Sequence, residues 1–590
     1  MKQFLMTVLG AFVGVWGALM FFAIVSVLMG VVFLTAFSGA FSSAPTTLTS
    51  QDKSILYLNL NGTISERSNP DDAITSFFND EDVPSSLDNI VKSISLAKAD
   101  DNIKGIFIEC NGASAGMATA YEIRKALEDF KLSKKWIYAY GNEGIEQRDY
   151  YVASVADSMF MNPYGMLDIR GLATNNLFYK NMLDKLGIEM QVIRVGSFKS
   201  AVEPYMLTSI SDANRLQQEV FLGSIWSTIS NQMSKSRNIA TPAFNVYADS
   251  ITLTRPTSYL KTNKLIDATC YKFDFDKKLK KLVKIDDDDD LIFVTPEEMV
   301  QTEIQTSESD KIAVLYAVGE INSHSKEGIV ADDMIENILD VAKDDDIKGL
   351  VLRVNSPGGS AYDSEQIWAA LEEFKKSGKP YAVSMGDYAA SGGYYISCGA
   401  NRIFAEPVTI TGSIGIFGVI PCIEGLLENK IGINQSLVQT NANGDLLNIS
   451  KKMTPFQQQS MQNYVNAGYE LFASRCAQGR KMPIDKLKEI AQGRVWDGAN
   501  AMKIGLIDEF GGLNDAIKWV ANKAKVKKYS TTILPEQEDF VTKYFSKYVV
   551  TKIKSAIMSE SGDLYKYQEE LQKILKQDHI QARMDMITVY

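Results

Sequence analysis

The sequence predicts an α/β protein that contains two tandem copies of one domain behind a single membrane-spanning helix. Three observations indicate this architecture: a long uncharged run at the amino terminus, an internal repeat, and alternating strand-like and helix-like segments within each copy. The 590 residues suffice for several domains. We expect a transmembrane segment at residues 1–50, the two copies at 51–300 and 301–527, and a helical tail at 528–590.

The amino terminus predicts an uncleaved signal anchor. No residue from Phe4 to Phe41 carries a charge. A helix needs about 20 apolar residues to span a bilayer, whereas a cleavable signal has a shorter apolar core of roughly 7–15 residues. Lys2 precedes the run, so the short end is expected to stay in the cytoplasm. We expect membrane contact through residues 4–37 and, in a bacterium, export of the remaining chain to the periplasm.

The exported part repeats itself at an offset of 244 residues. The segment IKGIFIECN (Ile103–Asn111) matches IKGLVLRVN (Ile347–Asn355). At the same offset, IRKALEDFKLSKK (Ile123–Lys135) matches IWAALEEFKKSGK (Ile367–Lys379). A gapless register of this length indicates a duplicated domain.

Within each copy, strand-like and helix-like segments alternate. Lys311–Gly319 and Lys348–Asn355 are short β-rich runs. Asp363–Gly378 has apolar residues at helical spacing, and Pro380–Gly386 is again strand-like. Alternation of this kind is typical of βαβ units and a largely parallel sheet.

Composition excludes several classes of function. The net charge is −11 and there is no basic block, which argues against a nucleic-acid partner. The five cysteines lack metal-ligand spacing and predict no disulfide framework. The run Asp286–Asp290 could hold a cation, although a solvated loop is the simpler interpretation. We expect no metal and no cofactor.

The two copies differ where chemistry is expected. Only the second has SPGG (Ser356–Gly359) before a helix, and such glycines can present backbone N–H groups to an oxyanion. Ser391, in AASGGYY, stands opposite Gln147 of the first copy. Ser413, in TGSIGIFG, stands opposite Ile169, so the hydroxyl occurs in one copy only.

A nucleophilic serine needs a base. The two histidines, His324 and His579, lie in polar segments, which makes a Ser-His-Asp triad an unfavourable interpretation. A lysine can serve if its pKa falls by about 3 units from about 10.4, through burial or crowding by cations. Lys199, in GSFKSAVEP, follows an apolar strand and a glycine and precedes small residues.

Five motifs resemble the bacterial signal peptide peptidase A family, in its long form with tandem domains: GSFKSAVEP, VNSPGG, AASGGYY, TGSIGIFG and GRVWDGANAMKIGLIDEFGG. Together they span nearly the whole exported region. The resemblance implies a crotonase-like fold (the ββα superhelix shared with the proteolytic subunit of Clp), a homotetramer, and a Ser/Lys dyad divided between the copies. Carried over by motif, Lys199 is the general base, Ser413 the nucleophile, and Gly358 and Gly359 the oxyanion donors.

The implied function is a membrane-anchored serine endopeptidase that degrades signal-peptide remnants and other short apolar peptides. Ser391 is the alternative nucleophile, because Clp-type peptidases carry their serine at that place. Two alternative functions stay open: a coenzyme-A-dependent hydratase or isomerase of the same superfamily, and a non-catalytic scaffold that binds apolar peptides.

Overall fold

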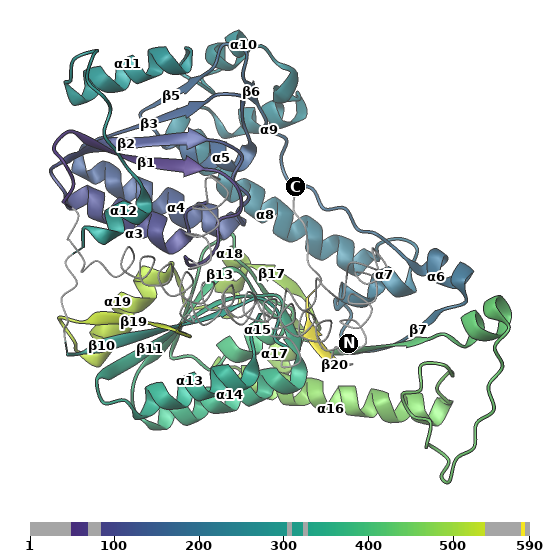
Figure 1. The fold of residues 1–590 in the computed structure, drawn as a ribbon. Coiled ribbons are helices and arrows are strands. Elements are labelled where there is room, and N and C mark those ends of the chain that lie inside the picture. The colour runs from purple at the N-terminus through teal and green to yellow at the C-terminus, as the bar shows by residue number, and fades with distance from the viewer. Residues whose placement is uncertain (1–48, 69–83, 304–308, 323–327, 537–579, 585–590) are drawn as a thin grey trace, which may run out of the picture. The chain divides into compact units, whose positions relative to one another are not determined.

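The computed structural model describes residues 49–68, 84–303, 309–322, 328–536 and 580–584 (Figure 1). The predicted membrane segment, both histidines and most of the predicted helical tail lie outside these ranges. Among the helices that are described, none is long and apolar enough to cross a membrane. Both copies of the repeat belong to one compact unit, residues 51–300 and 305–590; a second unit, residues 1–50 and 301–304, is described only at 49–50 and 301–303.

The first copy is built on a parallel sheet with the strand order β8-β5-β3-β2-β1-β9. Its strands are β1 (Ser54–Leu60), β2 (Ile103–Cys110), β3 (Trp136–Gly141), β5 (Ser158–Met161), β8 (Ala268–Thr269) and β9 (Phe293–Val294), with a separate short pair β4 (Gly144–Ile145) and β6 (Met166–Leu167). Its helices are α3 (Leu87–Ala99), α4 (Met117–Phe130), α5 (Gln147–Ala153), α6 (Lys180–Leu186), α7 (Glu203–Met206), α8 (Asp212–Arg237), α9 (Thr241–Asp249), α10 (Thr257–Thr262), α11 (Lys272–Val283) and α12 (Pro296–Gln301).

The second copy has an eight-stranded sheet that follows the same plan. Its strands are β10 (Lys311–Val318), β11 (Ile347–Ser356), β13 (Tyr381–Ala390), β14 (Arg402–Ala405), β15 (Ile410–Gly412), β17 (Val495–Asp497), β18 (Glu509–Phe510) and β19 (Ser530–Leu534). Its helices are α13 (Ala331–Lys343), α14 (Ala361–Lys376), α15 (Gly392–Ser397), α16 (Pro455–Gly479), α17 (Ile484–Ile490), α18 (Gly498–Lys503) and α19 (Leu513–Ala524). The order β14-β13-β11-β10 repeats β5-β3-β2-β1 of the first copy, and the pairing β1–β2 has a register shift at the same place as β10–β11.

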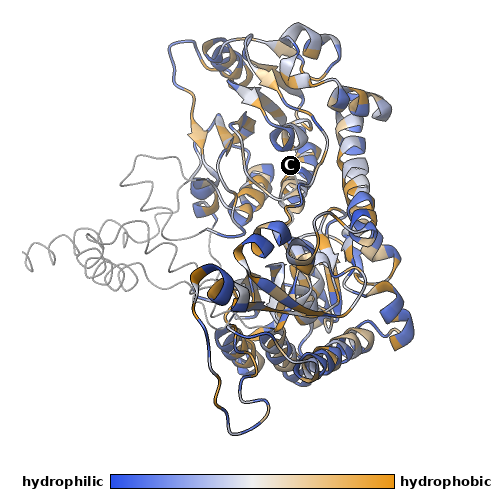
Figure 2. Cartoon of the chain, turned by 90° about the vertical axis from the view of Figure 1, so that its right-hand side faces the viewer, coloured by the Kyte–Doolittle hydropathy of each residue, from blue (hydrophilic) through white to orange (hydrophobic). Residues whose placement is uncertain are grey.

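Each of these two sheets is covered on both faces, which explains why its central strands carry buried apolar residues on both faces. In the second copy, α13 and α14 pack on one face, while α19 places Ala516 and Val520 against Ile312 and Val351 on the other. In the first copy, α11 covers the corresponding face. The helices are banded blue and orange in Figure 2, as expected for segments with one packed side and one solvated side.

A third sheet joins the two copies. Its order is β12-β20-β16-β7, where β12 (Gly358–Ser360) and β16 (Phe417–Cys422) come from the second copy. β7 (Glu189–Arg194) comes from the first copy, and β20 (Ile580–Arg583) from the carboxyl-terminal tail. The tail at 528–590 was expected to be helical; its described residues instead contain two strands, β19, which pairs with β10, and β20, which pairs with β12 and β16.

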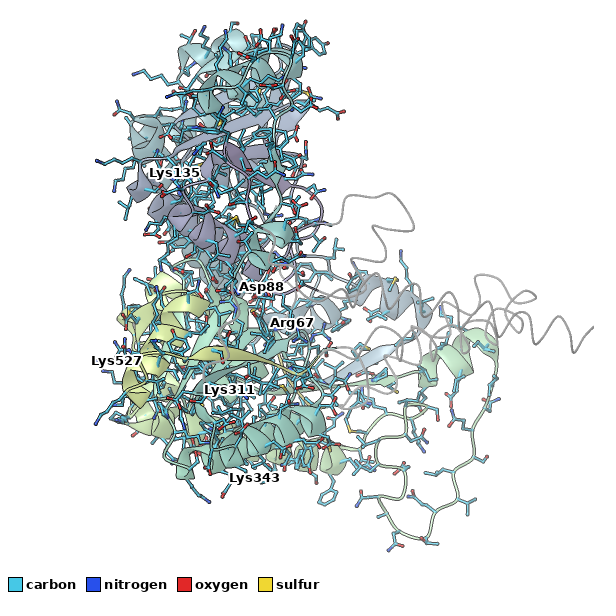
Figure 3. The ribbon with its side chains drawn as sticks, turned by 60° about the vertical axis from the view of Figure 1, so that its left-hand side comes forward. Arg67, Asp88, Lys135, Lys311, Lys343 and Lys527 are labelled. Atoms are coloured by element: carbon cyan, nitrogen blue, oxygen red, sulfur yellow. The ribbon has the colours of Figure 1, made fainter. Side chains whose placement is uncertain are left out.

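Buried charged side chains also connect the two copies. Arg353, with 0% of its surface exposed, donates to Glu66 Oε2 at 2.8 Å and to Glu122 Oε1 at 2.7 Å, both from the first copy. Asp387 Oδ1 accepts from the amide of Ala118 at 2.8 Å, at the start of α4. Figure 3 labels Arg67 in the same junction, where its Nη1 donates to the carbonyl of Pro535 at 2.9 Å. Such contacts fix one copy against the other and thereby fix any site built from both.

Candidate active site

Ser391 and Ser413 follow two neighbouring strands of the second sheet. β13 ends at Ala390 and β15 ends at Gly412, and these two residues are paired in parallel register. The carboxyl ends of parallel strands meet at one edge of the sheet, so the two serines lie side by side, and Ser391 N donates to Gly412 O at 2.8 Å. Both serines have positive φ, 56° and 49°. L-residues rarely adopt this conformation, and where they do it often serves a functional site.

Lys199 reaches this edge from the other copy. β7 pairs antiparallel with β16, with Arg194 opposite Phe417, and the chain then turns into the short 3₁₀ helix Ser200–Val202. The turn lies against Gly493 of the second copy: a Cβ there would lie 2.7 Å from Lys199 Cβ. A glycine is therefore required at position 493 for the lysine to approach.

The amine of Lys199 lies between the two serine hydroxyls. Lys199 Nζ is 2.9 Å from Ser391 Oγ, 3.0 Å from Ser413 Oγ and 3.2 Å from the carbonyl oxygen of Ser413. Only 1% of the lysine surface is exposed. No carboxylate forms an ion pair with this amine among the described residues, so its positive charge has no counter-ion there.

Burial without a counter-ion lowers the pKa of Lys199 from 10.5 to about 7. Desolvation disfavours the charged ammonium, and the surrounding hydroxyls and carbonyl provide no compensating charge. A substantial fraction of the amine is then neutral near pH 7. A neutral, buried amine at hydrogen-bond distance from a hydroxyl has the properties of a general base.

The glycines of SPGG lie beside Ser391. A Cβ on Gly358 would lie 2.7 Å from the amide nitrogen of Gly392, and a Cβ on Gly392 would lie 3.1 Å from the amide nitrogen of Gly359. The amide nitrogens of Gly359 and Gly392 thus lie close together at the start of α15. The Gly358 amide instead donates to Ser356 Oγ at 3.2 Å. Of the two oxyanion donors predicted from the sequence, Gly359 has the amide that fits the role better.

The remaining candidates from the sequence are the two histidines, the aspartate run and the cysteines. His324 and His579 lie outside the described residues. Asp286–Asp290 is an exposed loop, and no group of residues suited to hold a metal occurs in the described ranges. All five cysteines are free, and four of them are buried. Sequence reasoning missed Gly392 as a third glycine at the site, although its neighbour Ser391 was already a candidate.

Comparison with known proteins identifies the family. The family model for peptidase family S49 matches residues 129–286 and again 373–527, once in each copy. The chain is 37% identical over 453 residues to Protease 4 of Salmonella typhi, covering 75% of this chain and 73% of that protein. It is 34% identical over 564 residues to Protease 4 of Haemophilus influenzae, covering 91% and 89%. A putative signal peptide peptidase SppA of Enterococcus faecium is 32% identical over 269 residues, 44% of this chain and 77% of that one. The duplicated sheet around a buried lysine and two serines is therefore that of a peptidase, and the chain belongs to peptidase family S49.

Proposed function

We propose that the chain is a serine endopeptidase with a Ser/Lys dyad, in which Lys199 is the general base. One observation carries the proposal: an amine with a pKa of about 7 lies within 3.0 Å of two hydroxyls, next to two neighbouring backbone amides. Either hydroxyl could lose its proton to this amine, so the nucleophile must be chosen on further geometry.

That geometry favours Ser391 as the nucleophile, whereas the sequence motifs predict Ser413. The amide of Gly392 lies at the start of α15, directly after Ser391, and a Cβ on Gly392 would lie 3.1 Å from the amide nitrogen of Gly359. An oxyanion forms on the carbonyl that the nucleophile attacks, so its donors must lie close to that hydroxyl. The strand–serine–helix turn with positive φ at Ser391 also resembles the strained elbow that exposes a nucleophile in other hydrolases.

The hydrogen bonds of Lys199 are compatible with the same choice. A neutral amine has two N–H donors and one lone pair. The carbonyl of Ser413 can only accept, which uses one N–H. With Ser391 as the nucleophile, Ser413 Oγ accepts the other N–H and the lone pair accepts from Ser391 Oγ–H. In this arrangement Ser413 is a positioning residue that orients the base.

The proposed reaction is acyl transfer to serine followed by hydrolysis. Lys199 takes the proton from Ser391 Oγ as that oxygen attacks the substrate carbonyl, and the amides of Gly359 and Gly392 stabilise the tetrahedral oxyanion. The C–N bond breaks, Lys199 gives its proton to the departing amine, and an ester remains on Ser391. Lys199 then deprotonates a water, which attacks the ester; as the C–O bond breaks, Lys199 returns the proton to Ser391 Oγ and the acid product leaves.

The proposal includes the cellular setting implied by the sequence. The uncharged run at residues 4–41 supports a single anchor in the bacterial inner membrane, with the catalytic copies on the periplasmic side. We propose a crotonase-like fold for each copy, assembly as a homotetramer, and cleaved signal peptides and other short apolar peptides as substrates. Protease added to intact spheroplasts should degrade the bulk of the chain, and protection of the chain would contradict this topology.

Labelling distinguishes the two serines. A fluorophosphonate should form one adduct per chain, absent in Ser391→Ala and present in Ser413→Ala, because only the nucleophile bonds to phosphorus. Tandem mass spectrometry of the labelled peptide gives the site directly. An adduct on Ser413 would return the nucleophile to that residue, and no adduct on either serine would contradict the peptidase mechanism.

A further inference from the structure

Gln217 is a buried side chain that connects the segment around Lys199 (the lysine loop, residues 195–200) to the strands that precede the two serines. It lies on α8 of the first copy, and only 1% of its surface is exposed. Its Nε2 lies 3.3 Å from the carbonyl oxygen of Phe198 and 3.1 Å from Ser200 Oγ. These two residues flank Lys199 in the sequence. Gln217 therefore holds the chain on both sides of the buried amine.

The oxygen of the same amide contacts the second copy. The backbone N–H of Val495, the first residue of β17, donates to Gln217 Oε1 at 3.0 Å. Val495 is paired in antiparallel register with Gly412, the residue before Ser413. One side chain thus links the loop that carries the amine to the strand pair that leads to a serine. Because Val495 N can only donate and the carbonyl of Phe198 can only accept, the nitrogen and the oxygen of the amide cannot exchange places.

Arg494 adds a second link between the same parts of the molecule. Its carbonyl oxygen accepts from the amide of Ser413 at 2.7 Å. Its guanidinium carbon lies 5.0 Å from the ring centroid of Phe198, in the lysine loop. Since Arg494 directly precedes Val495, two consecutive residues of the second copy connect the lysine loop to the serines, one directly and one through the buried amide of α8.

The charged groups around the lysine loop leave its amine without a counter-ion. Arg194 Nη1 lies 3.5 Å from the carbonyl oxygen of Lys199, and Arg494 is a second cation. The carboxylate of Glu203 accepts from Asn214 Nδ2 at 3.1 Å and forms no ion pair with the amine. Burial is the cause of the lowered pKa of Lys199. Any change that gives this amine more water, or a carboxylate beside its loop, should therefore raise that pKa.

The next residue of α8, Gln218, provides a matched comparison. It is 6% exposed, and its Nε2 lies 3.1 Å from Asn214 Oδ1, an atom that also lies 3.0 Å from Gln217 Nε2. Its remaining side-chain partners are Thr174 and Asn176. Successive residues of a helix point about 100° apart. Within the described ranges, Gln218 accordingly makes no hydrogen bond to the lysine loop or to β17.

We infer that Gln217 is a positioning residue that holds the amine of Lys199 at the two serine hydroxyls. The role of the amine as a base rests on the proposed function, but its placement by Gln217 does not. Displacement of a reacting group by about 1 Å can lower a rate about a hundredfold. Gln217 acts through the lysine loop, so its loss should affect the chemical step more than the binding of a peptide.

Kinetics of Gln217→Met test this inference. Methionine has a similar length but cannot donate to the carbonyl of Phe198, so the lysine loop loses its tie. We expect kcat to fall about tenfold to a hundredfold with KM changed by less than about twofold. The apparent pKa in kcat/KM should rise towards the usual lysine value, because a loosened amine is less desolvated. Gln218→Met also removes buried hydrogen bonds from α8 and should leave this pKa unchanged. Equal kcat and equal apparent pKa in the two variants would overturn the inference.

Gln217→Glu is a second variant that disturbs the fold less. A carboxylate has the shape of the amide and still accepts from Val495 N, but it cannot donate to the carbonyl of Phe198. It also places a negative charge beside the lysine loop, so the apparent pKa should rise by about one unit. Gln218→Glu carries the same charge on the neighbouring face of α8 and should produce a smaller shift. If Gln217→Glu leaves the apparent pKa at its wild-type value, Gln217 does not act on the lysine, whatever the fate of Gln217→Met.

Labelling of the amine separates this inference from the proposed function. Competitive labelling with acetic anhydride, followed by mass spectrometry of the peptide that contains Lys199, measures the pKa of the amine without any hydrolysis. It should give about 7 in the wild-type chain and a higher value in Gln217→Met. If labelling shows this shift but no form of the chain hydrolyses peptides, the peptidase proposal fails and the positioning inference stands. If peptides are hydrolysed and neither the labelled pKa nor kcat responds to Gln217→Met, the positioning inference fails and the peptidase proposal stands.

Discussion

Lys199 Nζ and Ser391 Oγ lie 2.9 Å apart, although the two residues belong to different copies of the repeat and are separated by 192 positions in the chain. The contact exists because β7 of the first copy pairs with β16 of the second. In the proposed mechanism, one copy provides the amine and the other provides the hydroxyls and the glycines. Neither copy would then act as a peptidase alone.

Replacing the lysine should remove activity without unfolding the protein. Lys199→Met keeps an apolar stem of similar length but has no amine, so it should lower kcat/KM by several orders of magnitude. Lys199→Arg should also be inactive, because guanidinium does not give up its proton near neutral pH. Hydrolysis of a fluorogenic peptide measures the loss, and circular dichroism is the control for folding. Activity retained in Lys199→Met would require a different base.

The pH profile should report the lysine. Its pKa is lowered to about 7 by burial, so the neutral base becomes dominant above that pH. In the wild-type protein, kcat/KM should rise with pH and level off above about 7, far below the usual lysine range. If Ser413 positions the base, Ser413→Ala should shift this apparent pKa and lower kcat with little change in KM. A profile that rises only near pH 10 would contradict a buried, neutral lysine.

The same lysine should make stability depend on pH in a defined direction. Its pKa is about 7 in the folded chain and near 10.5 when unfolded, so between these values the unfolded state binds more protons and stability rises with pH. The resulting loss of unfolding free energy is complete below pH 7 and disappears towards pH 10.5. Lys199→Met removes it and should therefore stabilise the protein more at pH 6 than at pH 9, by about 3 kcal/mol in denaturant unfolding. Equal stabilisation at the two pH values would show that the lysine is not desolvated.

Much of this arrangement could be predicted from local sequence. The expected strand Lys311–Gly319 is β10 (Lys311–Val318), because its apolar residues from Ile312 to Ala317 are buried between helices. The expected helix Asp363–Gly378 begins two residues earlier, at Ala361, because Ser360 acts as N-cap and its hydroxyl accepts from Asp363 N at 3.2 Å. A lysine base was expected from the scarcity of histidines, and its role remains a prediction.

The pairings that complete the site could not be predicted in this way. β7 and β16 are more than 220 residues apart, and β20 is a four-residue strand with mixed polarity. Such short edges have no periodic signal, and their partners are set by how the copies pack. The choice between Ser391 and Ser413 depended on the same information: both sit in glycine-rich motifs, and only the fold shows which one adjoins Gly359.

The buried charged side chains at the junction between the copies should be essential for a site built from both copies. Arg353 is wholly buried between Glu66 and Glu122 of the first copy, and burial raises the pKa of Glu66 even with the arginine present. Arg353→Met leaves two buried carboxylates without a counter-ion, which should cost about 3–5 kcal/mol of unfolding free energy. The matched control is Arg402→Met, which breaks an exposed pair with Glu509 and should cost about 0–1 kcal/mol.

The pH dependence of that loss provides its test. A carboxyl whose folded-state pKa is raised destabilises the protein above its unfolded pKa, and the cost falls as pH drops and the group is protonated. Urea unfolding at pH 7 and pH 5 should therefore show a smaller difference between Arg353→Met and wild type at pH 5. Adding Glu66→Gln and Glu122→Gln to Arg353→Met should recover most of the stability, since no buried charge remains. Peptidase activity should follow the same order, because the network holds the copy that carries Lys199 against the copy that carries Ser391. An Arg353→Met protein as stable as Arg402→Met would show that the junction does not depend on these ions.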